Sequence, residues 1–467
     1  CSTVSCGHNM FRSLLLLVAL AGVCLAARKG KGIEEGYCVF EDVVGTWQFK
    51  ETARTFDTTL DCSRVADDFM YFKNFTFSFP NVVVDELGFT GTWVLLSYWG
   101  FEVNINERSY YGNFRYYIKG MCHAIDDGIA RDDTVRHFSC FTATRDDIRL
   151  TEKTRDSFPR KVVEKKESPL LDEMFVNDEA FIQRINAAQS SWTAKAYPEH
   201  EKYTNGEMLQ RAGGEYRPLP PLAKPSQELK ARSAVLPTNF DWRDIGGVNY
   251  ISPIQDQMSC GSCYSFASTA LMEARVRIET GNLRQDIFSN QDVVNCNYLT
   301  DGCGGGYAML AAGRYGMKYG IVNEECVPYV GVVQTCTTDP TCARTYNSGY
   351  EFVGGYYGAS TVEGMMEYLV TKGPLAIEYF VYDDFYSYTG GIYHHVELDA
   401  AEFDPYFAVT HVVLLVGYGV EPETGEKFWI AKNSWGVSFG EDGYFRIRRG
   451  TNEAAFESAP FDITVIS

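Results

Sequence analysis

The sequence predicts an α+β protein in which an antiparallel β-barrel precedes a larger domain whose helices come before its strands. Short alternating apolar runs separated by glycines, such as Phe75-Thr-Phe-Ser-Phe79, indicate the barrel. The larger domain begins near residue 236 and is rich in β-prone runs after residue 410. Residues 148–235 differ in composition from both neighbours, so we interpret them as a separate connecting segment.

Size and charge restrict the class of protein. A chain of 467 residues predicts two or three domains. An apolar content of 45% and a charged content of 22% are typical of a soluble globular protein. The net charge of −19 argues against binding to nucleic acid or to an anionic membrane surface, so we expect neither partner.

Residues 1–27 are interpreted as a leader. From Met10 the order is a basic residue, Arg12, then the apolar run 14–21, then small residues ending at Ala27. This order is typical of a secretory signal peptide over residues 10–27. A membrane anchor is the alternative, but it needs about 20 apolar residues. We therefore expect the secretory pathway, with a lysosome, an acidic vesicle or the extracellular space as destination.

Because the secretory pathway is oxidising, the number of cysteines indicates how many of them can be paired in disulfides. Three of the 14 cysteines, Cys1, Cys6 and Cys24, fall in the leader and leave an odd number. Disulfides plus one reactive thiol are the simplest solution. Zinc is disfavoured because the 7 histidines show no ligand-like spacing to the cysteines, so we expect no metal.

The β-rich domain spans residues 28–147. It holds four cysteines, enough for two internal bridges: Cys38, Cys62, Cys122 and Cys140. Asn74-Phe-Thr76 is an N-glycosylation sequon on a predicted strand or its edge.

The segment 148–235 contains one predicted amphipathic helix and a proline-rich end. The helix is indicated by spaced apolar residues, Phe181, Ile182, Ile185, Ala188 and Trp192. Four prolines follow between 218 and 225, which excludes a continuous helix there. The segment is either a plain linker or a removable pro-segment that covers a neighbouring surface.

Cys263 is the candidate nucleophile of the domain 236–467. Helically spaced apolar residues follow it up to Ile278, so the thiol is expected at or next to a helix N-terminus. The partial positive charge there favours a thiolate. Cys260 lies three residues earlier, so a redox pair, half of a zinc site and a structural cysteine are the alternatives.

Three other residues complete a possible acyl-transfer site. His411 begins an apolar run and could act as the base, and Asn433 could fix its tautomer. Gln257 could donate to an oxyanion together with the Cys263 amide. The alternatives are a structural histidine and a turn asparagine.

Together these motifs resemble those of the papain family of cysteine proteases. The resemblance rests on Gln257-Met-Ser-Cys-Gly-Ser-Cys-Tyr264, the glycine loop 302–306, His411 and Asn433-Ser-Trp-Gly436. It implies a two-lobed protease domain in which Cys263, His411, Asn433 and Gln257 are catalytic. It also implies that Gly305 and Gly306 pair with the substrate backbone, and that Trp435 shelters the bond between Asn433 and His411.

The β-rich domain with Gly45-Thr-Trp47, and the segments 185–194, 236–242 and 381–385, resemble a dipeptide-releasing branch of this family. That resemblance implies an exclusion domain, an excised pro-segment and a homotetramer of processed chains. It also implies an activating protease and a cut between heavy and light chains near 395–404, where the alternative is an ordinary surface loop. The implied bridges are 38–122, 62–140, 260–303, 296–336 and 326–342.

The expected activity is the removal of dipeptides from the free N-termini of peptides and proteins. The reaction is expected to pass through a thioester acyl-enzyme. An endopeptidase is the alternative if the exclusion domain does not seal the cleft. A non-catalytic protein whose barrel holds a ligand is the rival from another class, and the intact catalytic set argues against it.

This chain differs from that branch at two sites, and each difference changes an expected property of the enzyme. The position of its ammonium-binding aspartate is occupied by Ile33, so we expect neighbouring Glu34 or Glu35 to take that role. Its chloride site uses two tyrosines, where this chain has Met309 and Phe352. Neither side chain has an O–H donor, so weak or absent chloride dependence is expected.

Overall fold

The chain divides near residue 160 into two compact units. The structure, a computed structural model, describes residues 38, 40–57, 60, 62, 68–96, 100–115, 122–132, 137–145, 171–214, 219–398 and 409–466. The predicted signal peptide and both Glu34 and Glu35 lie outside these ranges. Within them, no helix combines the length and apolar character needed to cross a bilayer.

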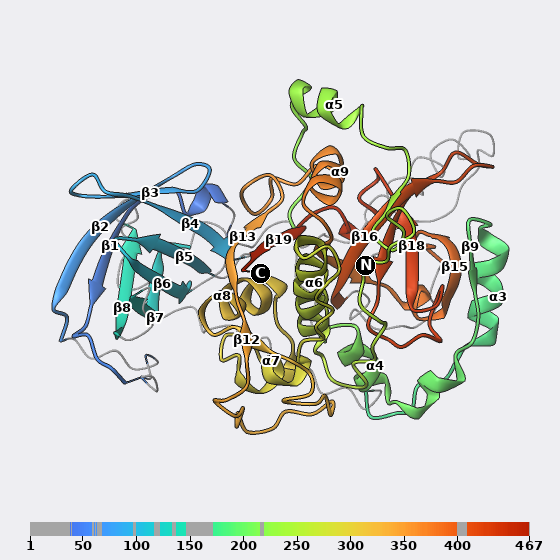
Figure 1. Ribbon diagram of the computed structural model, residues 1–467, viewed down its shortest axis with the longest axis horizontal. Coiled ribbons are helices and arrows are strands. Elements are labelled where there is room, and N and C mark those ends of the chain that lie inside the picture. Colours follow the sequence, from blue (N-terminus) through green and yellow to red (C-terminus); the bar gives the residue numbers. More distant parts are fainter. Residues whose placement is uncertain are drawn as a thin grey trace, which may run out of the picture. The chain divides into compact units, whose positions relative to one another are not determined.

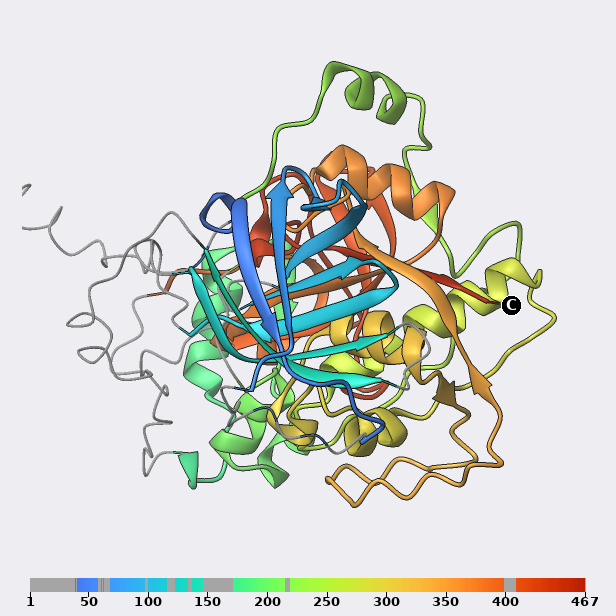
Figure 2. The same ribbon diagram turned by 90° about the vertical axis from the view of Figure 1, so that its left-hand side faces the viewer.

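Eight antiparallel strands of the first unit close into a barrel, as predicted (Figure 2). They are β1 (Gly45–Glu51), β2 (Tyr71–Ser78), β3 (Val82–Asp85), β4 (Thr90–Leu96), β5 (Gly100–Ile105), β6 (Arg108–Asn113), β7 (Ala124–Asp132) and β8 (Phe138–Arg145), after a 3₁₀ turn η1 (Phe40–Asp42). Alternate side chains of β2 point into the barrel and out to solvent: Phe75 and Phe77 are buried, whereas Thr76 is exposed. Phe79 lies past the end of β2 and is exposed.

The barrel interior holds packed aromatic rings and one buried ionic cluster. Trp47 and Phe49 stack among other rings of the inner face. Glu51 pairs with Arg108 at 2.7 Å and accepts a hydrogen bond from Ser139 Oγ at 2.8 Å. Burial raises the pKa of Glu51, but Arg108 and Lys73 outweigh it and hold the pKa below its usual value.

The second unit is built on a nine-stranded sheet with the order β13-β19-β14-β16-β17-β18-β15-β9, and β10 pairs with β16. The strands are β9 (Trp192–Ala194), β10 (Phe240–Asp241), β13 (Asn347–Phe352), β14 (Leu375–Val381), β15 (Tyr388–Tyr393), β16 (Val409–Val420), β17 (Lys427–Lys432), β18 (Tyr444–Arg448) and β19 (Phe461–Val465), with β11 (Ile321–Val322) and β12 (Arg344–Thr345) paired separately. Most of these strands follow the helices in sequence, so the predicted order of helices before strands is confirmed.

Helix α6 (Cys263–Glu279) lies at the centre of this unit and packs against β16 and β19 (Figure 1). It is buried on nearly every face, because one side meets the sheet and the other meets neighbouring helical segments. Those segments and the remaining turns are α7 (Asn290–Cys296), η4 (Gly302–Gly304), the π-helical η5 (Met309–Tyr315), α8 (Gly316–Lys318), α9 (Val362–Thr371), η6 (Asp383–Ser387) and η7 (Glu453–Ala455). The N-terminus of α6 is thereby fixed within the fold.

Residues 171–214 and 219–235 belong to the same unit. They form α3 (Glu179–Ala188), β9, η3 (Pro198–Lys202), α4 (Asn205–Arg211) and α5 (Gln227–Ser233). The predicted helix is present, with Ile182 and Ile185 as its buried residues. Its predicted extension to Trp192 is wrong. Trp192 is buried instead in β9, which adds to the sheet edge by pairing with β15.

Candidate active site

Cys263 is the first residue of α6 and the only free cysteine among the described residues. Ser262, the residue before the helix, offers no side-chain cap to the first turn. The thiol therefore lies where the partial positive charge of the helix N-terminus acts. The other described cysteines form the five expected bridges: 38–122, 62–140, 260–303, 296–336 and 326–342.

His411 lies near the start of β16, in the strand that packs against α6. Its Nε2 is 2.9 Å from Asn433 Oδ1, so Nε2 carries the proton and Nδ1 remains for another partner. Nδ1 has no hydrogen-bond partner among the described residues. The Trp435 ring lies 5.2 Å from the His411 ring. The predicted pairing of histidine and asparagine is present.

Tyr379 packs beside the histidine. It pairs with His411 across β14 and β16, with ring centroids 5.8 Å apart. Burial, and then the charge of a Cys263 thiolate, raise the pKa of the Tyr379 hydroxyl well above its usual value. Tyr379 thus contacts His411, and no local pattern in the sequence singles it out.

Gln257 is fully buried beside the turn that precedes α6. Its Nε2 donates to Cys260 O at 2.9 Å, and its Oε1 accepts from Ser434 Oγ at 2.6 Å. The amide has a second N–H that is available to an oxyanion. Ser434 thus orients Gln257, a contribution that the sequence motif alone did not reveal.

The glycine loop is attached to the nucleophile turn. The Cys260–Cys303 bridge and a hydrogen bond from Gly261 N to Cys303 O, at 3.0 Å, join the two loops. Gly305 has φ +126°, a conformation that favours glycine. A side chain at Gly306 would lie 2.7 Å from Thr300, so a bulkier residue does not fit there.

The segment 208–214 crosses this site. Gln210 Nε2 donates to Cys303 O at 2.6 Å, and Trp435 Nε1 donates to Arg211 O at 3.2 Å. Gly213, with φ +107°, lies so close to the strand that a Cβ would be 2.0 Å from Thr410 O. The segment therefore runs from the glycine loop to the residue next to His411 and covers the site.

Two buried histidines are expected to make the docking of the segment 208–214 depend on pH. Burial, opposed by the hydrogen bond to Asn433, lowers the pKa of His411 to about 4. Burial and the Arg211 charge lower the pKa of His200 to about 4, against opposing effects of Glu199 and Asp256. Lys202 also lowers it. Docking of the segment therefore favours the neutral form of both rings above about pH 4.

Falling pH is expected to release the segment. Between pH 6.5 and about 4 the undocked state binds more protons than the docked state, so acid favours undocking. Hydrogen exchange of residues 197–214 should be slow at pH 7 and faster at pH 4.5. His200→Gln, which removes one of the two titrating rings, should reduce that difference. Equal protection at both pH values would contradict the prediction.

Met309 and Phe352 are both buried, in η5 and at the end of β13. Phe352 packs against the rings of Tyr357 and Phe461. We therefore still predict that chloride has little effect on turnover. Rates measured with chloride replaced by acetate at constant ionic strength should agree within about twofold. A several-fold loss on chloride removal would contradict this.

Two family models match the chain. Residues 236–463 match the papain family cysteine protease model, and residues 35–145 match the cathepsin C exclusion domain. A curated relative, cathepsin C of Schistosoma mansoni, is 35% identical over 97% of this chain and 98% of its own length. The chain belongs to the papain family of cysteine proteases. Within the family it is a peptidase of the cathepsin C, or dipeptidyl peptidase I, type.

Other papain-family relatives match the second unit. Cathepsin B-like cysteine proteinase 3 of Caenorhabditis elegans is 33% identical over 59% of this chain and 79% of its own length. The solved structure of digestive procathepsin L2 from Tenebrio molitor covers 68% of this chain and 95% of its own, with 29% identity and a TM-score of 0.51. The papain-like fold of the second unit is therefore confirmed.

Proposed function

We propose that this enzyme releases dipeptides from the free N-termini of peptides and proteins. The single observation that carries the proposal is the presence in one chain of the cysteine–histidine–asparagine site and a domain matching the exclusion domain of cathepsin C. A papain-like cleft alone accepts long chains. A domain that blocks the cleft two residues before the scissile bond leaves room only for a dipeptide.

In the proposed mechanism Cys263 and His411 form the reacting pair. The thiolate of Cys263 attacks the scissile carbonyl, and the oxyanion that forms accepts hydrogen bonds from Gln257 and the Cys263 amide. His411 then gives its proton to the leaving amine as the C–N bond breaks and a thioester remains. Water, deprotonated by His411, attacks the thioester; the C–S bond breaks, the dipeptide is released, and the Cys263 thiolate and the His411 imidazolium are restored.

The remaining roles concern orientation. Asn433 Oδ1 keeps the His411 tautomer fixed by accepting from Nε2. Trp435 excludes water from that bond. Gly305 and Gly306 pair with the substrate backbone, because they allow close approach. We propose that Glu34 or Glu35 binds the substrate ammonium group.

Blocking the substrate N-terminus tests the proposal. A peptide with a free N-terminus should release its first dipeptide, whereas the same peptide acetylated at its N-terminus should lose at least about 100-fold in kcat/KM. The reason is that the acetyl group removes the ammonium charge and adds bulk where the cleft is expected to end. Mass spectrometry of the products measures both reactions. Internal cleavage of the acetylated peptide would favour the endopeptidase alternative.

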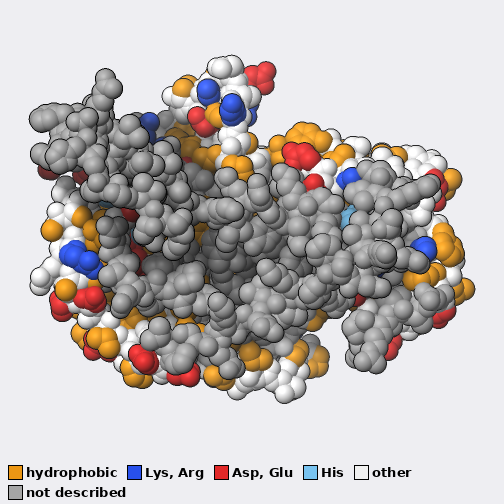
Figure 3. Space-filling view, turned by 180° about the vertical axis from the view of Figure 1, so that it is seen from behind, with side chains coloured by type: hydrophobic (Ala, Val, Ile, Leu, Met, Phe, Trp, Pro, Cys, Tyr) orange, Lys and Arg blue, Asp and Glu red, His pale blue; other side chains and the backbone are white. Residues whose placement is uncertain are grey.

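We propose that residues 148–235 are an excised pro-segment and that another protease begins activation. The exposed α5, which projects at the top of Figures 1 and 3, supports an accessible cut. None of its residues is buried, and its surface carries Glu228, Lys230 and Arg232. Ser226 caps it by accepting from Leu229 N at 3.1 Å.

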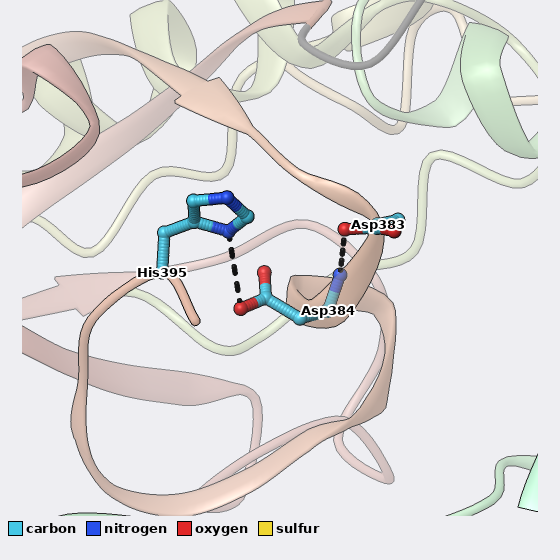
Figure 4. A group of neighbouring side chains, drawn as sticks. All are labelled: Asp383, Asp384 and His395. Atoms are coloured by element: carbon cyan, nitrogen blue, oxygen red, sulfur yellow. Dashed lines mark hydrogen bonds and ion pairs between the residues drawn. The ribbon is translucent and has the colours of Figure 1, made fainter. Parts of the chain in front are cut away.

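We also propose a cut near 395–404, which lies partly outside the described residues. A hydrogen-bonded group supports this position, because it would hold the new chain end (Figure 4). Asp384 accepts from Tyr393 Oη at 2.6 Å and from Val396 N at 2.8 Å. It also pairs with His395 at 3.2 Å, and Asp383 accepts from the Asp384 amide.

Further proposals concern location and assembly. Five disulfides and the cathepsin relatives are consistent with the secretory or lysosomal pathway. Asn74 is exposed on β2, which supports glycosylation at this position. We propose that processed chains assemble as a homotetramer and that peptides are the substrates.

A further inference from the structure

The guanidinium of Arg211, in the segment that covers the site, has a set of partners typical of a specific cation site. Arg211 is 2% exposed, and its Nη1 donates to Asp256 Oδ1 at 3.0 Å and to Met258 O at 2.6 Å. It also donates to Tyr203 Oη at 3.0 Å. The guanidinium carbon lies 4.7 Å from the Tyr203 ring centre and 5.9 Å from that of Trp435. A carboxylate, a carbonyl and aromatic faces together recognise a cation.

Three of these partners belong to the protease domain and remain when the pro-segment leaves. They are Asp256, the carbonyl of Met258 and the indole of Trp435, here called the cation recess. Without Arg211, the Asp256 carboxylate and the Met258 carbonyl face the Trp435 ring with no cationic partner from the pro-segment. Tyr203 leaves together with Arg211, because it belongs to the same segment.

Contacts within the protease domain, rather than contacts with Arg211, hold the cation recess in place. Asp256 Oδ1 accepts from Met258 N at 2.9 Å, and a β-bridge joins the backbones of Asp256 and Trp435. Met258 has φ +56°, so its carbonyl is held in an uncommon orientation. These contacts are independent of the pro-segment and should persist after its removal.

The position of the recess relative to the scissile bond follows from His411. Trp435 lies against His411, and in the proposed mechanism His411 protonates the leaving amine. The recess therefore lies on the leaving-group side, beside the first residues after the scissile bond.

We infer that Asp256, the Met258 carbonyl and Trp435 form a specificity subsite for an arginine or lysine among the first two residues after the scissile bond. Arg211 occupies this subsite in the precursor. Arginine should be favoured over lysine, because a planar guanidinium can stack on the indole while it donates to oxygen acceptors. The inference rests on the proposed function only for which peptide bond is cleaved. A preference for the residues after the scissile bond can be measured for any bond that the enzyme cleaves.

Peptides that differ only after the scissile bond test the inference. The processed enzyme is given free-terminal peptides with Arg, Met or Glu at the third or fourth position, and the products are measured by mass spectrometry. Arg is expected to raise kcat/KM about three- to tenfold over Met, and Glu to lower it, as for a partly exposed ion pair reinforced by an aromatic face. In Asp256→Asn the ratio of Arg to Met should fall to about one.

The variants are matched. Asn at position 256 keeps the oxygen that accepts from Met258 N, so the loop is preserved while the charge is lost. Glu423→Gln, on the exposed turn between β16 and β17, makes the same change in net charge and should keep the wild-type ratio. Equal rates with Arg and Met in the wild type, or an unchanged preference in Asp256→Asn, would overturn the inference.

A binding measurement keeps this test separate from that of the proposed function. Processed Cys263→Ala enzyme should bind the Arg peptide about three- to tenfold more tightly than the Met peptide by calorimetry. Equal affinities would overturn the inference even if dipeptides are released. Cleavage of capped peptides would instead contradict the exopeptidase proposal, while the ratio of Arg to Met would still report on the subsite.

Discussion

Cys263→Ala is expected to lower kcat by at least about 10⁴-fold, equivalent to about 5 kcal/mol of transition-state stabilisation. The reason is that every step of the proposed mechanism passes through the Cys263 sulfur. Cys263 is also the only free thiol among the described residues, so no neighbouring described cysteine can replace it. Steady-state kinetics of the processed enzyme with a free-terminal peptide measures the loss.

The control for this variant is its fold. A buried cysteine replaced by alanine loses one sulfur atom, so the five disulfides and the thermal transition should persist with a small shift in Tm. Activity of Cys263→Ala within about tenfold of the parent would show that another group performs the attack.

Gly213→Ala is expected to raise the activity of the unprocessed precursor by about tenfold or more. Gly213 has φ +107°, and an added Cβ would be 2.0 Å from Thr410 O, so alanine cannot occupy the docked position without displacing the segment. A strain of about 1–3 kcal/mol corresponds to roughly a 5- to 150-fold change in the docking equilibrium. Hydrolysis by a precursor with its activation cuts blocked measures the effect.

Gly246→Ala is the matched control for the precursor experiment. Gly246 also has a positive φ, +62°, but a Cβ there would meet nothing within 4 Å. It should therefore cost similar local strain without changing the activity of the precursor. If Gly213→Ala and Gly246→Ala both behaved as the parent, the segment at residues 208–214 would not control access to the site.

Local patterns in the sequence predicted much of the fold. The alternation around Phe75 and Phe77 indicated the barrel, and the helical spacing after Cys263 placed the thiol at the first residue of α6. Both are properties of neighbouring residues. Trp192 was assigned to a helix because its spacing fits one, but pairing of β9 with β15, about 200 residues away, decides its conformation.

The site was predicted in outline, and its supporting contacts were not. Cys263, His411, Asn433 and Gln257 stand out by residue type and motif. Ser434 orients Gln257 through a hydrogen bond between residues 177 positions apart, and no local pattern reports it. Arg211 and Asp256 are likewise joined only by the fold. Glu34 and Glu35 lie outside the described residues, so their role stays a prediction.

Alkylation of the processed, unreduced enzyme tests the central claim most directly. Iodoacetamide should add one label per chain at Cys263, with activity lost in proportion to labelling. His411→Ala should slow the labelling near pH 6, because the imidazole no longer favours the thiolate. A label on another cysteine, or a peptide map with Cys263 in a disulfide, would contradict the account.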